Sequence, residues 1–322
     1  MSLAGPTRAP AQAQGELLEA RRALDHLDVE RAERLLELLS SQRPGDPRVL
    51  AQLGRLRLHQ GRYDDATRAL ARSLALSPAR GDHDWRPVTL ELAQATREAT
   101  ADFVEERSAD GRYVVLHPAG DQALLAPYAL ETLRRADQAL RRELGGHAPI
   151  PLRLEIYASP EDLARVSPLT VEEIETSGTI ALSKWDRLMI TSPRALIRGY
   201  PWRDTIGHEL AHLLLARSTQ NRAPVWLQEG VAKLLERTWR QPLGSGELDP
   251  ASRGLLYEAA RDGALIPFSR LHPSIALLPS QRQAALAFAE VTSFVGGYRS
   301  RLGLGCLEEL AARLRAGDDA RA

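Results

Sequence analysis

Two histidines four residues apart, with a glutamate directly after the first, are the residues of this chain best suited to chemistry. They lie in the sequence His208-Glu209-Leu210-Ala211-His212. Residues four apart project from the same face of a helix, so both rings can direct a nitrogen at one Zn²⁺. Glu209 then lies beside the metal without binding it, where a general base can take a proton from a zinc-bound water. The motif predicts a hydrolytic metal site.

A second acidic residue stands at a spacing that suits a third ligand. Glu229 follows in the sequence Trp226-Leu227-Gln228-Glu229-Gly230. Pro224 favours the first turn of a second helix, which we expect to run to about Arg240. Three protein ligands leave the fourth position of a single Zn²⁺ per chain open for water. The alternative is a surface helix with two solvated histidines and an unrelated acid.

The residues around these motifs resemble the gluzincin zinc metallopeptidases, and among them the bacterial peptidase MA-like domains. The resemblance covers roughly residues 105 to 310. Three segments carry it: Leu188 to Leu196, Tyr200 to His212 with its HExxH, and Ala223 to Lys233 with its WLxEG. It implies a thermolysin-like fold that acts on a peptide or protein substrate. It also implies His208, His212 and Glu229 as the zinc ligands.

The chain departs from that family at the position of an orienting acid. Thermolysin-like relatives carry an acid four residues beyond the ligand glutamate, where this chain has Lys233. A zinc-bound imidazole normally donates its other N–H to a carboxylate or carbonyl. Asp204, one helical turn before His208, and Glu236 are the candidates. We expect a larger loss of zinc affinity or activity from replacing Asp204 than from replacing Glu236. The alternative role of Asp204 is to stabilise the helix N-terminus by its charge.

A second departure concerns the donor that stabilises the oxyanion of the transition state. Relatives often have a tyrosine late in the chain, where this sequence has Phe288. Phenylalanine cannot donate a hydrogen bond, so zinc alone or another donor must serve. Tyr257 and Tyr298 are the candidates, although each is equally consistent with packing.

The first hundred residues repeat with a period of thirty-four. The offset pairs small residues, leucines and prolines, which is the spacing of tetratricopeptide repeats. The pairs are Ala20 with Gly54, Leu24 with Leu58, Ala32 with Ala66, Leu36 with Leu70 and Pro44 with Pro78. Two repeats, at 13–46 and 47–80, precede a capping helix from Trp85 to Glu106. The repeats either bind a protein partner or serve as a platform for the rest of the chain.

Between the repeats and the histidines, the pattern predicts a small sheet. Expected elements are a strand at 112–116, a helix at 126–144, a strand at 152–157 and a hairpin of 179–182 with 187–191. The resemblance implies a mostly antiparallel sheet whose edge strand, Leu188 to Thr191, pairs with an extended substrate.

The fold class is therefore α+β, with helical hairpin repeats before a sheet and a helix pair. The predicted divisions are a disordered tail at 1–14, repeats at 15–106 and a metallopeptidase domain at 107–322. Within that domain the sheet part spans 107–200, the zinc helices 203–240 and the C-terminal helices 250–322.

Composition excludes several classes of function. The 322 residues are 43% apolar and 26% charged, as in globular chains of two domains. Forty-two basic and forty-two acidic side chains give no net charge, hence no electrostatic case for nucleic acid or an anionic membrane. No uninterrupted apolar run is long enough for a membrane span. The single cysteine, Cys306, excludes an intramolecular disulfide.

The compartment stays open. Residues 1–14 lack the apolar core of a signal peptide, which predicts the cytoplasm for the chain as it stands. A periplasmic or cell-envelope location follows if an export signal has been removed. The excess of arginine over lysine suggests a GC-rich bacterial genome.

The function predicted from the sequence is zinc-dependent hydrolysis of peptide bonds by a water that Glu209 activates. The alternative is a non-catalytic interaction scaffold with tetratricopeptide repeats and a structural zinc. Hydrolysis of a non-peptide amide is a third possibility. A structural site normally has four protein ligands and no use for Glu209, which favours catalysis.

Overall fold

The chain divides into two compact units. The computed structural model describes residues 10–79, 81–170, 174, 180–242, 248–275 and 278–318. The first unit comprises residues up to Asp102 together with the short segments 165–168 and 185–187. The second comprises residues 103–164, 169–184 and those from Leu188 onward. An α+β chain with helical repeats first is the predicted class.

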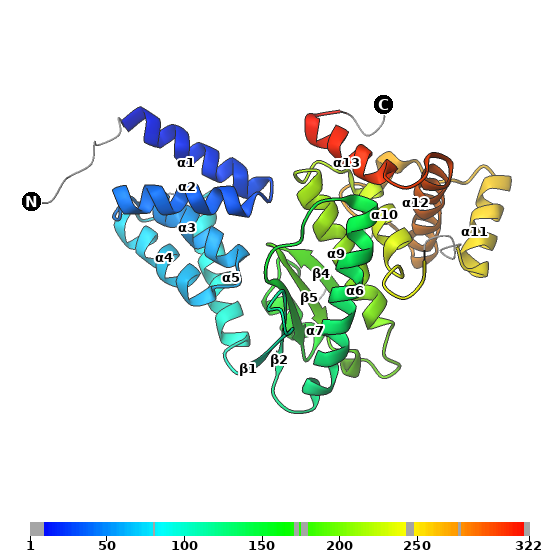
Figure 1. The fold of residues 1–322 in the computed structure, drawn as a ribbon, viewed down its shortest axis with the longest axis horizontal. Helices are drawn as coiled ribbons and strands as arrows, with labels where there is room; N and C mark the ends of the chain where they lie inside the picture. Colours follow the sequence, from blue (N-terminus) through cyan, green and yellow to red (C-terminus); the bar gives the residue numbers. More distant parts are fainter. Residues whose placement is uncertain are drawn as a thin grey trace, which may run out of the picture. The chain divides into compact units, whose positions relative to one another are not determined.

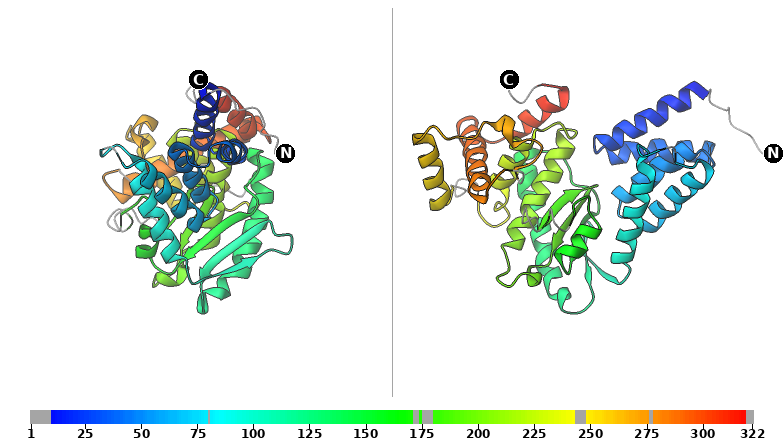
Figure 2. Two further views of the ribbon diagram at one scale, coloured as in Figure 1. Left: turned by 90° about the vertical axis from the view of Figure 1, so that its left-hand side faces the viewer. Right: turned by 180° about the vertical axis from the view of Figure 1, so that it is seen from behind.

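The first unit consists of two helical hairpins and a fifth helix. The helices are α1 (Pro10–Asp25), α2 (Val29–Gln42), α3 (Pro47–His59), α4 (Tyr63–Leu76) and α5 (Trp85–Ala99). α1 packs on α2, α3 packs on α4, and α5 covers α4 (Figures 1 and 2). Because α1 begins at Pro10, residues 10–14 are helical rather than part of a disordered tail. Residues 1–9 lie outside the described part.

The repeat positions pack as the period predicts. The small residues and leucines at the paired positions have no exposed surface: Ala20, Ala32, Leu36, Ala66 and Leu70. Gly54 shows why a small residue is needed, since a Cβ there would lie 2.5 Å from Cγ of Leu70. The close approach of α3 and α4 depends on that missing side chain.

The expected capping helix is shorter than predicted. α5 ends at Ala99, and residues 103–107 form strand β1 (Phe103–Arg107), so the first unit ends at Asp102 rather than at residue 106. β1 pairs antiparallel with β2 (Tyr113–Pro118). Gly111, with φ of +68°, lies in the connection between them. The pairing of β1 with β2 outweighs the helical pattern that continues past Ala99.

The second unit contains a mixed sheet of five strands in the order β1-β2-β3-β5-β4. β3 (Leu152–Tyr157) runs parallel to β2, which corrects the expected mostly antiparallel sheet. The reason is α6 (Ala126–Leu144), whose length lets the chain cross over and return in the same direction. Its bounds and those of β3 match the prediction.

The hairpin expected before the histidines is present. β4 (Ala181–Lys184) and β5 (Arg187–Thr191) are joined by Trp185 and Asp186, whose φ angles of 54° and 63° suit a two-residue hairpin turn. Thr179 lies outside the described residues. β4 is the edge strand, whereas β5 lies between β3 and β4. The predicted edge position of residues 188–191 is therefore wrong, because the hairpin places its first strand outermost.

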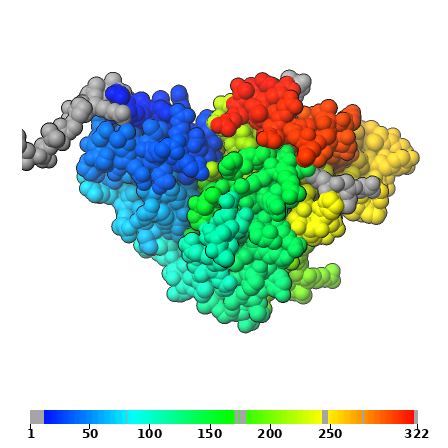
Figure 3. All heavy atoms as spheres, in the orientation of Figure 1, coloured from blue at the N-terminus to red at the C-terminus, as the bar shows by residue number. Residues whose placement is uncertain are grey.

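The remaining helices lie between the strands or after the last of them. They are α7 (Pro160–Arg165), α9 (Trp202–Ser218), α10 (Val225–Leu235), α11 (Pro250–Arg261), α12 (Gln281–Leu302) and α13 (Cys306–Ala316), with short 3-10 turns η1 (Asp121–Leu125), η2 (Pro193–Ala195) and η3 (Phe268–Leu271). α10 ends before the predicted Arg240. α13 (red) lies beside α12 (orange) in Figure 3. No helix within the described ranges is long and apolar enough to cross a bilayer.

One core joins the sheet to the helices that carry the histidines. Alternate residues of β2, β3 and β5 belong to it, as the two-residue period of a strand requires. α6 and α9 pack on each other and supply most of the remaining apolar side chains. Ile206, Leu210 and Leu214 of α9 have no exposed surface. The helix that bears the motif is thus anchored along its apolar face.

Candidate metal centre

The histidines of α9 face each other across one helical turn. Their Nε2 atoms are 3.1 Å apart and their ring centroids 4.8 Å apart. The four-residue spacing places His208 and His212 on the same side of the helix, while the leucines between and beyond them turn into the core. The sequence prediction of a shared face is confirmed.

Glu229 of α10 completes a group of three. Its Oε2 atom lies 3.7 Å from Nε2 of His208 and 3.6 Å from Nε2 of His212. α10 can hold this position because Gly230 allows it to approach α12, where a Cβ would meet the carbonyl oxygen of Val291 at 2.8 Å. The three side chains that the sequence nominated as ligands therefore converge.

The spacing of these atoms suits a small tetrahedral cation. Zinc–ligand bonds of about 2.0 to 2.1 Å at the tetrahedral angle separate neighbouring ligand atoms by about 3.3 Å. The three observed separations run from 3.1 to 3.7 Å. In the described part of the chain, no further His, Cys, Asp or Glu joins the group. The side chains are 17 to 23% exposed, so the centre is open to solvent on one side.

The electrostatics of the centre favour a bound positive charge. Burial lowers the pKa of His208, but the carboxylates of Glu229 and Glu236 outweigh it and raise that pKa to about 10. For Glu229, burial raises the pKa, and the two histidines more than reverse this, so its pKa lies well below the usual range. The carboxylates of Glu229 and Glu236 thus lie on two sides of His208. A cation bound among these groups would be stabilised by their negative charge.

Glu209 occupies a different environment from Glu229. Its carboxyl is buried, and burial raises its pKa against the opposing effect of His212 and His208. The backbone of Ser183 in β4 also opposes this rise in the pKa. Glu209 is not among the converging ligand atoms. It lies on α9, which packs against the edge strand β4, and it is near the group without belonging to it, as a residue that transfers protons needs to be.

The acid that contacts the second ring nitrogen of His208 is Glu236. Its Oε2 atom lies 3.4 Å from Nδ1 of His208. The ammonium of Lys233 holds the same carboxylate at 2.9 and 3.1 Å. Lys233 occupies the position at which the resemblance predicts an acid. Its ammonium binds Glu236, and Glu236 is the acid that contacts His208.

Asp204 does not take the role that its spacing predicts. Its carboxylate accepts hydrogen bonds from Nε and Nη2 of Arg240 at 2.8 and 2.7 Å, and from Nε1 of Trp239 at 3.0 Å. These partners follow the end of α10 and draw the carboxylate away from the imidazole. We therefore correct the expectation that Asp204 orients His208: the acid in contact is Glu236.

Gly207 fixes the position of Glu236. A Cβ at residue 207 would lie 2.4 Å from the backbone oxygen of Glu236 and 3.2 Å from its carbonyl carbon. The end of α10 thus approaches α9 within backbone contact, one residue before His208. The sequence signal was available, because a glycine inside a buried helix costs stability and needs a reason for its presence.

The other predicted donors lie elsewhere. Tyr257 on α11 is 70% exposed, and Tyr298 on α12 packs against the core near Cys306. Phe288 packs in a separate apolar cluster with α11. His117 is buried against Glu106 and His272 is exposed, and neither joins the metal group among the described residues.

A tyrosine to which the sequence assigned no role is electrostatically coupled to the centre. Burial and the carboxylate of Glu209 raise the pKa of Tyr200 well above its usual range. Its hydroxyl donates a hydrogen bond to the carbonyl of Thr191 at the end of β5. Tyr200 precedes α9 by two residues, so helical periodicity gave no signal for it.

Comparison with known families gives a match within the first unit. Residues 11–81 match the tetratricopeptide repeat family model. The match covers α1 to α4 and ends before the second unit begins. It supports a role in protein interaction for the first unit. No curated protein matched the chain.

Proposed function

We propose that the second unit is a zinc-dependent metallopeptidase. The proposal rests on one observation: His208, His212 and Glu229 converge at zinc spacing, while a buried Glu209 lies beside them outside the ligand group. The three groups fit Zn²⁺ in type and in separation. When bound there, the metal supplies Lewis-acid polarisation of the scissile carbonyl and of the attacking water.

The residues of the chain supply the remaining steps. Glu209 takes a proton from the attacking water and then delivers it to the leaving amine nitrogen as the C–N bond breaks. The backbone of Ser183 in β4 favours the ionised form of Glu209, which is the form that accepts the proton. Glu236, braced by Lys233, orients His208 through Nδ1.

The edge strand β4 suits an extended substrate. β4 packs against α9 and is the outermost strand of the sheet on that side. The backbone of Ser183 in this strand is near enough to Glu209 to lower its pKa. A peptide that adds to this edge by main-chain hydrogen bonds would pass Glu209 without needing a particular side chain. β4 replaces β5 in this role, because β5 is internal.

A non-catalytic scaffold is the second candidate, and the repeat match favours it for the first unit. A structural zinc normally has four protein ligands. In the described part of the chain, three side chains converge and the buried carboxyl of Glu209 lies outside the ligand group. This arrangement favours an open centre. The two functions are compatible, since they belong to different units.

The test measures new amino termini released from an unfolded protein by the zinc-loaded chain. Wild type should release them, and Glu209→Gln should bind zinc but release them at least about 10²-fold more slowly. Glu308→Gln, on α13, is the matched control and should behave as wild type. Equal rates for wild type and Glu209→Gln would refute peptide hydrolysis by this centre. If the chain hydrolysed a non-peptide amide but released no new termini from the protein, a non-peptide substrate would be favoured.

A further inference from the structure

The second unit carries an excess of positive charge beside the metal centre. Five cationic side chains share three carboxylates there, at ion-pair distances of 2.6 to 3.6 Å. The cations are Arg135, Arg203, Lys233, Arg237 and Arg240, and the carboxylates are those of Glu131, Asp204 and Glu236. We call these residues the basic surface. From its chemistry we propose that it binds an acidic segment of an extended protein chain.

Three segments of the second unit bring the basic surface together. Glu131 and Arg135 lie one turn apart on α6, and Arg203 and Asp204 lie in the first turn of α9. The other four residues follow Glu229 on α10 and on the hydrogen-bonded turn after it. Because α9 packs on both α6 and α10, the charges gather around its first turn. Within the described ranges, no other carboxylate pairs with the five cations.

Two of the cations are firmly held and form the framework of the surface. Arg203 donates a hydrogen bond to Glu131 at 2.6 Å, and its guanidinium carbon lies 4.2 Å from the ring centroid of Trp239. Arg240 donates two hydrogen bonds to Asp204, at 2.8 and 2.7 Å. The donors of these two guanidinium groups are therefore engaged within the unit.

Arg237 and Arg135 are the cations whose charge is least matched. Nε of Arg237 lies 3.6 Å from both Asp204 and Glu236, whereas a closer cation holds each of these carboxylates. Arg135 shares Glu131 with a guanidinium that lies nearer, at 2.6 Å against 3.1 Å. Both side chains are 47% exposed. Exposed guanidinium groups without a close carboxylate of their own favour carboxylates from a ligand.

The number of unmatched charges favours a carboxylate ligand over a nucleic acid. Proteins that bind nucleic acid commonly contact about 6 to 10 phosphates. Two guanidinium groups suit two carboxylates, each of which a planar guanidinium binds through two parallel N–H···O bonds. The chain as a whole has no net charge that would draw a polyanion to it.

Lys233 joins the basic surface to the metal centre. It lies one turn after Glu229 on α10, and the acid that it binds, Glu236, contacts His208. Arg237 follows Glu229 by eight residues, which corresponds to about 12 Å of helical rise. An extended chain covers that distance in about four residues. This last step rests on the proposed function: if the centre hydrolyses peptides, the acidic segment belongs to the substrate, about four residues from the bond that is cut.

The experiment uses the zinc-loaded full chain with Glu209→Gln, so that labelled peptides stay intact during fluorescence anisotropy. One peptide consists of Glu, Leu and Ser, and the comparison peptide has Gln in place of every Glu. We expect the acidic peptide to bind at least about fivefold more tightly at low ionic strength, through two exposed ion pairs. The preference should shrink as salt is added. Arg135→Gln combined with Arg237→Gln should bind both peptides alike, and zinc content is measured in every variant.

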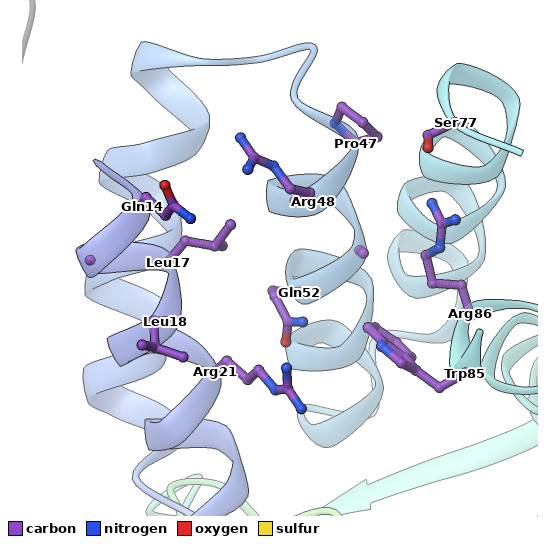
Figure 4. Close-up of a pocket in the computed structure, with 12 residues that line it drawn as sticks. Gln14, Leu17, Leu18, Arg21, Pro47, Arg48, Gln52, Ser77, Trp85 and Arg86 are labelled. Carbon is purple, nitrogen blue, oxygen red and sulfur yellow. The ribbon is translucent and has the colours of Figure 1, made fainter. Parts of the chain in front are cut away.

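Two controls place the binding on this surface. Arg282→Gln on α12 removes an exposed arginine that pairs with Glu258 at 2.9 Å, away from the basic surface. Arg21→Gln removes one of the three arginines, Arg21, Arg48 and Arg86, that line a cavity of about 510 Å³ in the first unit (Figure 4). Both controls should keep the full preference for the acidic peptide.

Several results would overturn the proposal. Equal affinity for the two peptides, or no binding of either, would show that the surface does not recognise carboxylates. Loss of the preference in Arg282→Gln or Arg21→Gln would place the binding elsewhere. A single-stranded oligonucleotide that binds more tightly than the acidic peptide, and loses its affinity in the double variant, would assign the surface to nucleic acid.

Hydrolysis by the wild type separates this proposal from that of the metallopeptidase. We expect KM for the acidic peptide to be lower by about the same fivefold factor, with kcat unchanged, because the contact is made equally in the ground and transition states. Preferential binding without cleavage of either peptide would support the basic surface and refute peptide hydrolysis. Cleavage of both peptides with equal KM would support hydrolysis and overturn the role of the basic surface.

Discussion

At the scale of single residues, His208 is contacted on both ring nitrogens. Glu229 lies at Nε2 and Glu236 at Nδ1. The HExxH spacing predicted that His208 and His212 lie on one side of α9, because helical geometry relates residues four apart. It was not sufficient to choose between Asp204 and Glu236. The partners that draw Asp204 away, Trp239 and Arg240, come from a turn after α10 whose position no local pattern specifies.

Replacing Glu236 should therefore weaken zinc binding, in contrast to the expectation from sequence. Loss of the carboxylate at Nδ1 of His208 should reduce zinc affinity by about 10 to 100-fold in Glu236→Gln. Competition with a zinc chelator measures this directly. Asp204→Asn is the comparison and should retain zinc far better. A weakened Asp204→Asn beside an unchanged Glu236→Gln would show that the sequence expectation was right.

Asp204 should instead matter for stability, and its contribution should depend on pH. Burial raises the pKa of Asp204, but the hydrogen bonds from Arg240 and Trp239 outweigh this and lower it. A carboxyl with a lowered folded-state pKa stabilises the fold above its unfolded pKa of about 3.9 and loses that contribution as pH falls through the folded value.

Urea unfolding of wild type and Asp204→Asn between neutral and acidic pH tests this. At pH 7 the variant should be less stable by about 1.5 to 3 kcal/mol, the range for hydrogen bonds to charged groups. The difference should shrink toward acidic pH. A difference that stays constant across the range would mean that the charge of Asp204 contributes nothing.

At the scale of elements, two glycines set the distances that form the centre. Gly207 brings the end of α10 to α9, and Gly230 brings α10 to α12. Periodicity predicted the strongest elements well: α6 and β3 have the expected bounds. Periodicity failed for β1, which pairs with a strand later in the chain, and the resemblance failed for the edge position of residues 188–191. Both errors concern strand pairing, which depends on partners outside the local sequence.

Gly207→Ala should separate α9 from the end of α10. The added methyl group meets backbone, which cannot rotate away, so we expect a loss of about 1 to 3 kcal/mol of unfolding free energy. Zinc affinity should fall with it, since Glu236 moves from His208. Gly254→Ala on α11 is the matched control: nothing lies within 4 Å of its Cβ, and it should gain up to about 1 kcal/mol. Unchanged stability and zinc affinity in Gly207→Ala would contradict this account of the helix contact.

At the scale of the whole molecule, the chain joins a repeat unit that matches a known family to a second unit for which we propose zinc chemistry. The thirty-four-residue period predicted the hairpins because each repeat is one local helical unit.

The central claim is that His208, His212 and Glu229 form an open zinc site and leave Glu209 for chemistry. The most direct measurement is the zinc stoichiometry and affinity of wild type, Glu229→Gln and Glu209→Gln by chelator competition. We predict one zinc per chain in wild type and in Glu209→Gln, and markedly weaker binding in Glu229→Gln. Wild-type affinity in Glu229→Gln, or loss of zinc in Glu209→Gln, would contradict the assignment.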